Sequence, residues 1–295
     1  MANDKHRFGV MVGVDGSGPS DTAVRWAAHD ALLRKCPLTL VHAVAPPLLP
    51  WSASQMPAEL RQRQERDAQA VLDDAVRIAN DTTGDDSSVD IDRQVFVSPP
   101  VPTLVDLSNE ADMVVVGSHG LGAVHRMLLG SVSSGLLHQA RCPVAVVHSD
   151  AQAQARPVHD AVLLGIDGSP ASELATAIAF EEASLRATSL VALHVWSDTD
   201  RTSTSSIEES ALRAAAEETL AERLAGWEER YPDVSVTRIV EYDHPATHLL
   251  ERSKLAQLVV VGSHGRGGFT GMLLGSVSAA VAQAARVPVV VARSH

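Results

Sequence analysis

One glycine pattern, Gly-x2-Gly-x9-Gly-Ser, occurs twice in this chain of 295 residues, once in each half. Its first copy comprises Gly117, Ser118, His119, Gly120, Gly130, Ser131, Val132 and Ser133. Its second copy comprises Gly262, Ser263, His264, Gly265, Gly275, Ser276, Val277 and Ser278. Identical spacing over a pattern of this length predicts a tandem duplication of one domain.

The sequence around the pattern is repeated as well. Asp15 aligns with Asp167 at an offset of 152 residues, whereas the glycine patterns are 145 residues apart. The difference falls in the variable middle of each half, where loops tolerate deletions. We therefore expect one domain at residues 1–149, a polar linker at 150–157 and a second domain at 158–295, and the chain length is sufficient for two cores.

Each half alternates apolar strands with helical stretches. Expected strands of the first half are 10–14, 38–44, 89–97, 113–117 and 144–148, with helices at 21–34, 57–80, 103–109 and from residue 131. Expected strands of the second half are 162–166, 190–196, 234–240, 258–262 and 289–292, with helices at 171–186, 207–230, 246–253 and from residue 276. This alternation of Val-rich strands with helices predicts a parallel sheet covered on both faces.

Composition narrows the functional classes. The chain is 45% hydrophobic and only 3% aromatic, which suits closely packed Ala and Val. With 36 acidic against 24 basic residues and no basic run, nucleic-acid binding is not expected. Cys36 and Cys142 form no C-x-x-C pair, so we expect reduced thiols. A signal peptide and membrane spans are not expected either, and we therefore predict a cytoplasmic protein.

A carboxylate follows the first strand of each half, where ligands of parallel sheets bind. Gly13 and Asp15 occupy this place in the first half, and Gly165 and Asp167 in the second. The carboxylate could accept hydrogen bonds from a ribose hydroxyl or a base amine. Alternatively, the Asp simply caps the following helix.

The glycine pattern itself predicts a phosphate site. Its glycines let backbone N–H groups turn inward, the helix that begins at the Ser presents free N–H groups, and the Ser hydroxyls add donors. The alternative is a glycine-rich loop with an ordinary Ser N-cap, but two copies with identical spacing favour phosphate. His119 and His264 are interpreted as loop residues near phosphate, because the thirteen histidines show no metal-ligand spacing.

The end of the second strand offers a weaker signal. Ala43 and Val195 could pack on a purine, and Asp198 could reach its polar edge, although ordinary strand packing explains these residues equally well. The chain has no Walker motif and no dinucleotide G-x-G-x-x-G, and its motifs contain neither a G-x-S-x-G elbow nor a phosphoryl-holding Lys. The motifs therefore indicate binding without an evident catalytic base.

At these residues the chain resembles the tandem, ATP-binding type of the universal stress protein family, over residues 7–293. The resemblance implies two Rossmann-like (adenine nucleotide alpha hydrolase-like) α/β domains. Each would have a five-stranded parallel sheet of order 3-2-1-4-5 with helices on both faces, and dimerisation would use the last strand. It also implies that Asp15 and Asp167 contact the nucleoside of ATP. Phosphates would be held by Gly117, Gly120, Gly130, Ser131, Gly262, Gly265, Gly275 and Ser276, with Mg²⁺ bound through the ATP phosphates.

The two phosphate loops differ in one respect. The second continues with Arg266 and Gly267, whereas the first has Leu121 and Gly122. Since Arg can reach a phosphate, we expect tighter ATP binding in the second half. The favoured function is a nucleotide-dependent stress regulator with two ATP sites per chain. We expect it to form a homodimer and to act on a regulatory protein partner. The alternatives are a slow ATP-hydrolysing or phosphotransfer enzyme and a structural pseudo-dimer that has lost nucleotide.

Overall fold

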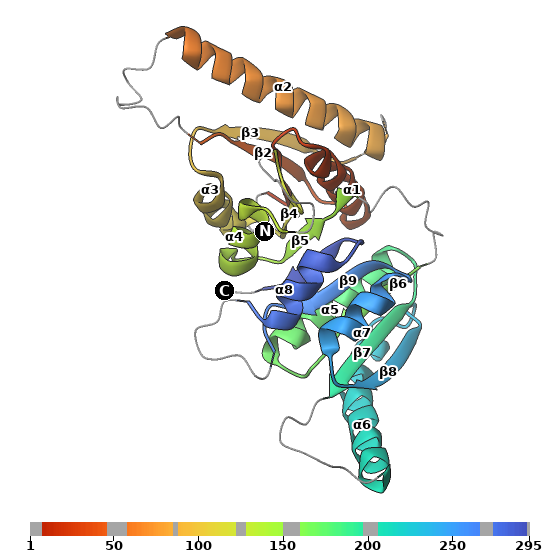
Figure 1. Ribbon diagram of the computed structural model, residues 1–295. Coiled ribbons are helices and arrows are strands. Elements are labelled where there is room, and N and C mark those ends of the chain that lie inside the picture. Colours follow the sequence, from red (N-terminus) through yellow and green to blue (C-terminus); the bar gives the residue numbers. More distant parts are fainter. Residues whose placement is uncertain are drawn as a thin grey trace. The chain divides into compact units, whose positions relative to one another are not determined.

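The computed structural model describes residues 8–45, 58–84, 88–121, 128–149, 160–196, 206–265 and 274–293. The chain divides into two compact units, residues 1–152 and 153–294. In Figure 1 the first runs from red to yellow-green and the second from green to blue. The linker expected at residues 150–157 lies outside the described residues.

The first unit is a five-stranded parallel sheet with the order β3-β2-β1-β4-β5. Its strands are β1 Val10–Gly13, β2 Leu38–Ala43, β3 Ile91–Phe96, β4 Met113–Gly117 and β5 Val144–Val147. Its helices are α1 Gly18–Arg34, α2 Ala58–Thr83, α3 Pro100–Leu107, the short 3₁₀ helix η2 Ser108–Glu110 and α4 Ser131–Gln139. The predicted fold class and strand order are confirmed.

The second unit repeats this arrangement with the order β8-β7-β6-β9-β10. Its strands are β6 Ala161–Gly165, β7 Leu190–Trp196, β8 Val236–Tyr242, β9 Ala256–Gly262 and β10 Val289–Ala292. Its helices are α5 Pro170–Leu185, α6 Ser206–Arg230, α7 Pro245–Ser253 and α8 Ser276–Ala284. Both units therefore place the carboxyl ends of their first and fourth strands next to each other.

The predicted element boundaries are wrong by a few residues at some ends. Helix α1 begins at Gly18 instead of residue 21, and α3 at Pro100 instead of residue 103, because a Pro near each start is already set for helical geometry. The edge strand β3 is shorter than the expected 89–97 and matches the six residues of its single partner β2. Strand β8 runs over 236–242 instead of 234–240, in register with all seven residues of β7.

Small side chains are prominent where β1, β4 and α1 meet in the first unit. On β1 and β4, Val10, Val12 and Val114 are fully buried. Helix α1 contacts both of these strands and helix α2. Its fully buried Ala residues are Ala23, Ala27, Ala28 and Ala31. The low aromatic content thus lets the helices approach the sheet and each other closely.

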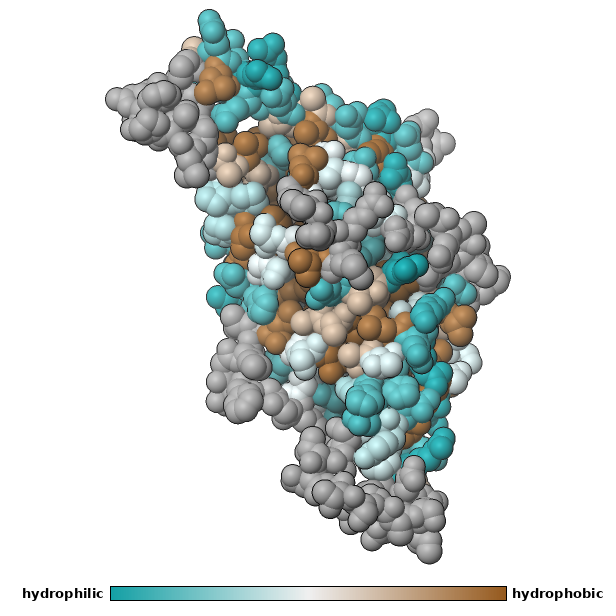
Figure 2. Space-filling view, viewed as in Figure 1, coloured by the Kyte–Doolittle hydropathy of each residue, from teal (hydrophilic) through white to brown (hydrophobic). Residues whose placement is uncertain are grey.

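Helix α2 has a narrow buried side and a broad hydrophilic side. It buries Ala68, Leu72, Ala75, Ile78 and Ala79. The hydrophilic residues gather along the helix at the top of Figure 2. Within the described parts of the chain, every helix is too short or too polar to cross a membrane.

The second unit uses aromatic residues where the first uses Ala. Phe180 aligns with Ala28 at the 152-residue offset and is fully buried. Its ring centroid lies 6.0 Å from that of Trp227 and 5.8 Å from that of Tyr231, both near the end of α6. Helices α5 and α6 are therefore joined through an aromatic cluster rather than through small side chains.

Replacing the central ring of this cluster tests its contribution. Phe180→Ala leaves a cavity between α5 and α6, so we expect the free energy of unfolding to fall by about 3–5 kcal/mol. Denaturant unfolding of the full chain followed by circular dichroism measures the loss. Phe180→Leu is the matched control and should lose clearly less. A loss below about 1 kcal/mol for Phe180→Ala would show that the cluster does not hold the two helices together.

Candidate functional site

A cavity of about 600 Å³ lies at the carboxyl ends of β1, β2 and β4 in the first unit. The predicted residues that line it are Gly13, Asp15, Ala43, Gly117, His119, Gly120, Leu121, Gly130, Ser131, Val132 and Ser133. Residues not predicted also line it, namely Val14, Val41, Pro100, Leu104, Val116, Leu128 and Leu129. The sequence thus indicated the loops, while the apolar wall contributed by α3 was missed.

The carboxylate of Asp15 joins the loop after β1 to the loop after β4. Its Oδ1 accepts a hydrogen bond from the Ser17 N–H at 3.0 Å, and its Oδ2 accepts one from the Leu121 N–H at 3.2 Å. A Cβ added at Gly120 would overlap Asp15 Oδ2, so this close approach requires glycine. The cap of α1 is Ser17, whose Oγ accepts from the Ser20 N–H at 3.3 Å. Asp15 therefore links loops and is not the N-cap that the alternative interpretation assigned.

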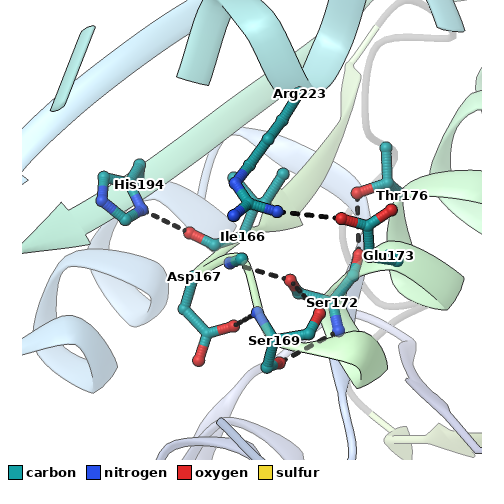
Figure 3. Close-up of polar contacts among 9 residues, drawn as sticks. Ile166, Asp167, Ser169, Ser172, Glu173, Thr176, His194 and Arg223 are labelled. Carbon is teal, nitrogen blue, oxygen red and sulfur yellow. Dashed lines mark hydrogen bonds and ion pairs between the residues drawn. The ribbon is translucent and has the colours of Figure 1, made fainter. Parts of the chain in front are cut away.

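The second unit repeats the arrangement around Asp167. As Figure 3 shows, its Oδ1 accepts from the Ser169 N–H at 2.9 Å, and Ser169 Oγ caps α5 by accepting from the Ser172 N–H at 3.2 Å. Ser169 Oγ also donates to the His264 carbonyl at 3.2 Å. A Cβ added at Gly265 would overlap Asp167 Oδ2. The same carboxylate–glycine contact thus occurs in both units.

The glycine that ends the fourth strand permits a second close approach. A Cβ on Gly117 would lie 2.8 Å from the carbonyl carbon of Pro19, and one on Gly262 would lie 2.8 Å from that of Ala171. Both Pro19 and Ala171 lie in the first turn of the helix after the first strand. These glycines therefore hold the two loops of each unit close together.

The helices after the glycine loops of the repeated pattern begin without a side-chain cap. Their N-caps are Gly130 and Gly275, and neither makes a side-chain cap hydrogen bond. The alternative of an ordinary Ser N-cap is therefore wrong. Uncapped N–H groups and the positive end of the helix dipole favour an anion at this position.

The Ser hydroxyls of the pattern have different roles. Ser133 Oγ donates to the Gly117 carbonyl at 2.8 Å, and Ser278 Oγ donates to the Gly262 carbonyl at 2.5 Å. These two buried hydroxyls connect the helix start to the end of the fourth strand. Ser131 is exposed and lines the cavity. Of Ser131 and Ser133 in the first unit, Ser131 therefore has the hydroxyl that is better placed to meet a ligand.

A histidine ties the end of the second strand to the loop after the first. Nδ1 of His42 lies 2.6 Å from the Val14 carbonyl oxygen, and Nδ1 of His194 lies 2.8 Å from that of Ile166 (Figure 3). Since a carbonyl can only accept, Nδ1 is the donor in both rings. Val195 occupies on β7 the place of the cavity residue Ala43 on β2. The predicted site residues outside the described part of the chain are Gly122, Asp198, Arg266 and Gly267.

The acidic residue in the first turn of the helix after the first strand has different charged neighbours in the two units. Burial raises the pKa of the Asp21 carboxyl in the first turn of α1, with Arg25 opposing the shift and Asp15 adding to it. The equivalent Glu173 in the second unit forms an ion pair with Arg223 of α6 at 2.9 Å, as Figure 3 shows. In the second unit, Glu173 in the first turn of α5 is thus paired directly with the guanidinium of Arg223.

Comparisons with known proteins agree with this geometry. The sequence model of the universal stress protein family matches this chain twice, at residues 9–148 and 159–293. The chain belongs to the universal stress protein family.

Full-length relatives support the assignment. Universal stress protein Rv2005c of Mycobacterium tuberculosis is 53% identical over 293 residues, covering 99% of each chain. Universal stress protein Rv2623 of the same organism is 49% identical, again over 99% of each chain. A solved universal stress protein from Archaeoglobus fulgidus is similar in fold, with a TM-score of 0.71 and 20% identity over 97% of this chain and 98% of that one. The predicted family is therefore confirmed over the whole tandem chain.

The contact between Asp15 and the phosphate loop can be tested at one glycine. Gly120→Ala places a methyl group against Asp15 Oδ2, so we expect the Leu121 N–H to lose its acceptor and to exchange with solvent about tenfold faster or more. Amide hydrogen exchange measured by NMR reports this rate. Gly18→Ala is the matched control, because an added Cβ there meets nothing within 4 Å. Unchanged exchange at Leu121 in Gly120→Ala would contradict the proposed tight approach.

Proposed function

We propose that this universal stress protein binds ATP at the carboxyl edge of each sheet and acts as a nucleotide-dependent regulator in stress or dormancy responses. The observation that carries the proposal is the convergence of three features on one cavity. A carboxylate after β1, a glycine loop and an uncapped helix start meet there around a cavity of about 600 Å³. This volume lies within the roughly 300–1,000 Å³ of small-molecule sites.

The lining suggests how ATP would lie in the first unit. Val41, Ala43 and Leu104 offer an apolar wall for the adenine, next to Asp15 for the ribose. The phosphates would lie against the N–H groups of Gly120 and the start of α4, where the helix dipole stabilises negative charge. Mg²⁺ would be held through the phosphate oxygens. In the described residues, no group of three or more His, Cys, Asp or Glu side chains is placed to hold a metal.

Binding is better supported than catalysis. Phosphoryl transfer depends on positioned cations and on a base or acceptor near the nucleophile. Both oxygens of Asp15 already accept backbone hydrogen bonds, so this carboxylate is engaged in holding the loops. A conformational readout by a protein partner, in a homodimer, therefore fits the site better than rapid turnover. Slow hydrolysis or phosphotransfer is the alternative.

ATP titration tests the proposal directly. We expect two ATP molecules per chain by isothermal titration calorimetry, and Asp15→Ala should weaken the first site about tenfold or more while leaving the second intact. Asp167→Ala should do the converse, and Gly18→Ala should change neither site. A steady-state phosphate-release assay accompanies the titration. Undetectable ATP binding would defeat the proposal, and rapid Mg²⁺-dependent turnover abolished by the Asp variants would favour the enzyme.

The difference between the two loops predicts unequal sites. We propose that Arg266 strengthens phosphate binding in the second unit, whereas Leu121 adds no charge in the first. Leu121→Arg should therefore tighten the first site and Arg266→Leu weaken the second, each by about tenfold, since hydrogen bonds to charged groups contribute about 1.5–3 kcal/mol. Adenosine, which has no phosphate, is the control ligand and should bind all variants alike. Equal ATP affinities of both sites in the unaltered protein would contradict this prediction.

A further inference from the structure

Each phosphate loop contains a buried serine hydrogen-bonded to the histidine that follows it. Ser118 Oγ lies 3.0 Å from His119 Nδ1, and Ser263 Oγ lies 3.0 Å from His264 Nδ1. The two serines are only 3% and 5% exposed. The same distance in both units marks the pair as part of the repeated design of the loop.

The surroundings of the serine fix the direction of this hydrogen bond. Among the described residues, the Ser118 hydroxyl forms a hydrogen bond with His119 alone. The Ser263 hydroxyl likewise forms one with His264 alone. If Nδ1 were the donor, the buried hydroxyl hydrogen would have no acceptor, which is energetically costly. The serine therefore donates to Nδ1. Since a neutral imidazole carries one hydrogen, it lies on Nε2.

The histidine stands beside the proposed phosphate position. His119 lines the same cavity as Gly120, Gly130 and Ser131. A Cβ added at Gly130 would lie 3.1 Å from His119 Cα, and one added at Gly275 would lie 3.2 Å from His264 Cα. The backbone of each histidine thus packs against the N-cap of a helix whose first turn has no side-chain cap.

We propose that His119 and His264 bind a phosphoryl oxygen of the nucleotide through Nε2–H, and that Ser118 and Ser263 are positioning residues that hold each ring in the donor tautomer. This inference rests on the proposed function and adds a histidine donor to a cradle of backbone N–H groups and the Ser131 hydroxyl. Asp15, the other titratable side chain of the described cavity lining, is held at the Leu121 N–H. The pair thus selects phosphorylated nucleotides over nucleosides.

The tautomer is measured first, on the full-length protein without ligand. Ring ¹⁵N NMR should find hydrogen on Nε2 of His119 and His264, and on Nδ1 of His42 and His194, whose Nδ1 atoms face carbonyls. Ser118→Ala should abolish the single tautomer of His119 and leave His264 unchanged. Hydrogen on Nδ1 of His119 in the unaltered protein would overturn the proposed role of the histidine. This outcome does not depend on whether the protein binds ATP.

Binding is then measured by calorimetry with ATP and with adenosine. His119→Ala should weaken ATP at the first site about 10- to 100-fold, and His119→Gln, whose amide N–H replaces Nε2–H, should remain within about threefold. Neither variant should change adenosine binding. The untouched second site of the same chain is the matched control for folding.

A double-mutant cycle separates positioning from general structure. Ser118→Ala should weaken ATP about 3- to 10-fold in the native background and have no further effect in His119→Ala, because it acts through the histidine. Equal losses in both backgrounds, or a matching loss of adenosine binding, would overturn the proposal. If the unaltered protein binds no ATP, the proposed function fails. If it binds ATP and His119→Ala changes nothing, this inference alone fails.

Discussion

The two carboxylate oxygens of Asp15 connect the two loops that line the cavity of the first unit. One accepts from the loop after β1 and the other from the loop after β4, and Gly120 admits the carboxylate by having no side chain. Asp167 and Gly265 make the same close approach in the second unit. Removing either partner would break a direct link between the two loops that line the cavity, which is next to the close approach of Gly117 to Pro19.

Around this constant frame the two units have diverged. Ala28 is buried on α1 in the first unit, whereas Phe180 at the equivalent place on α5 packs against the α6 aromatics in the second. The acidic residue in the first helical turn is Asp21 in one unit, where burial raises its pKa and Arg25 lowers it, and Glu173 in the other, where it is paired with Arg223. Because the groups that we propose to face the nucleotide come mostly from the backbone and from helix starts, the side chains around them can change without dismantling the site.

The repeat and the alternation of strands and helices were sufficient to predict the fold class and both loops, whereas the strand order came from the resemblance to the family. The exact roles of several polar side chains were not predictable, because they depend on contacts between distant segments. Ser17 caps α1 while Asp15 reaches a residue far along the chain. Similarly, Ser133 lines the cavity but its hydroxyl donates to the Gly117 carbonyl at the end of β4. Apolar lining from Pro100 and Leu104 was missed because α3 looks like an ordinary covering helix until it is seen against the cavity.

The bond between Asp15 and Leu121 spans 106 residues of sequence. Such a contact forms only after β4 has joined β1, because closing so long a segment costs conformational entropy that local structure does not repay. The site is consequently a late product of folding, and a fragment ending before β4 would lack it. A ligand bound there favours the completed sheet over every partly assembled state, which couples occupancy to the lifetime of the whole unit.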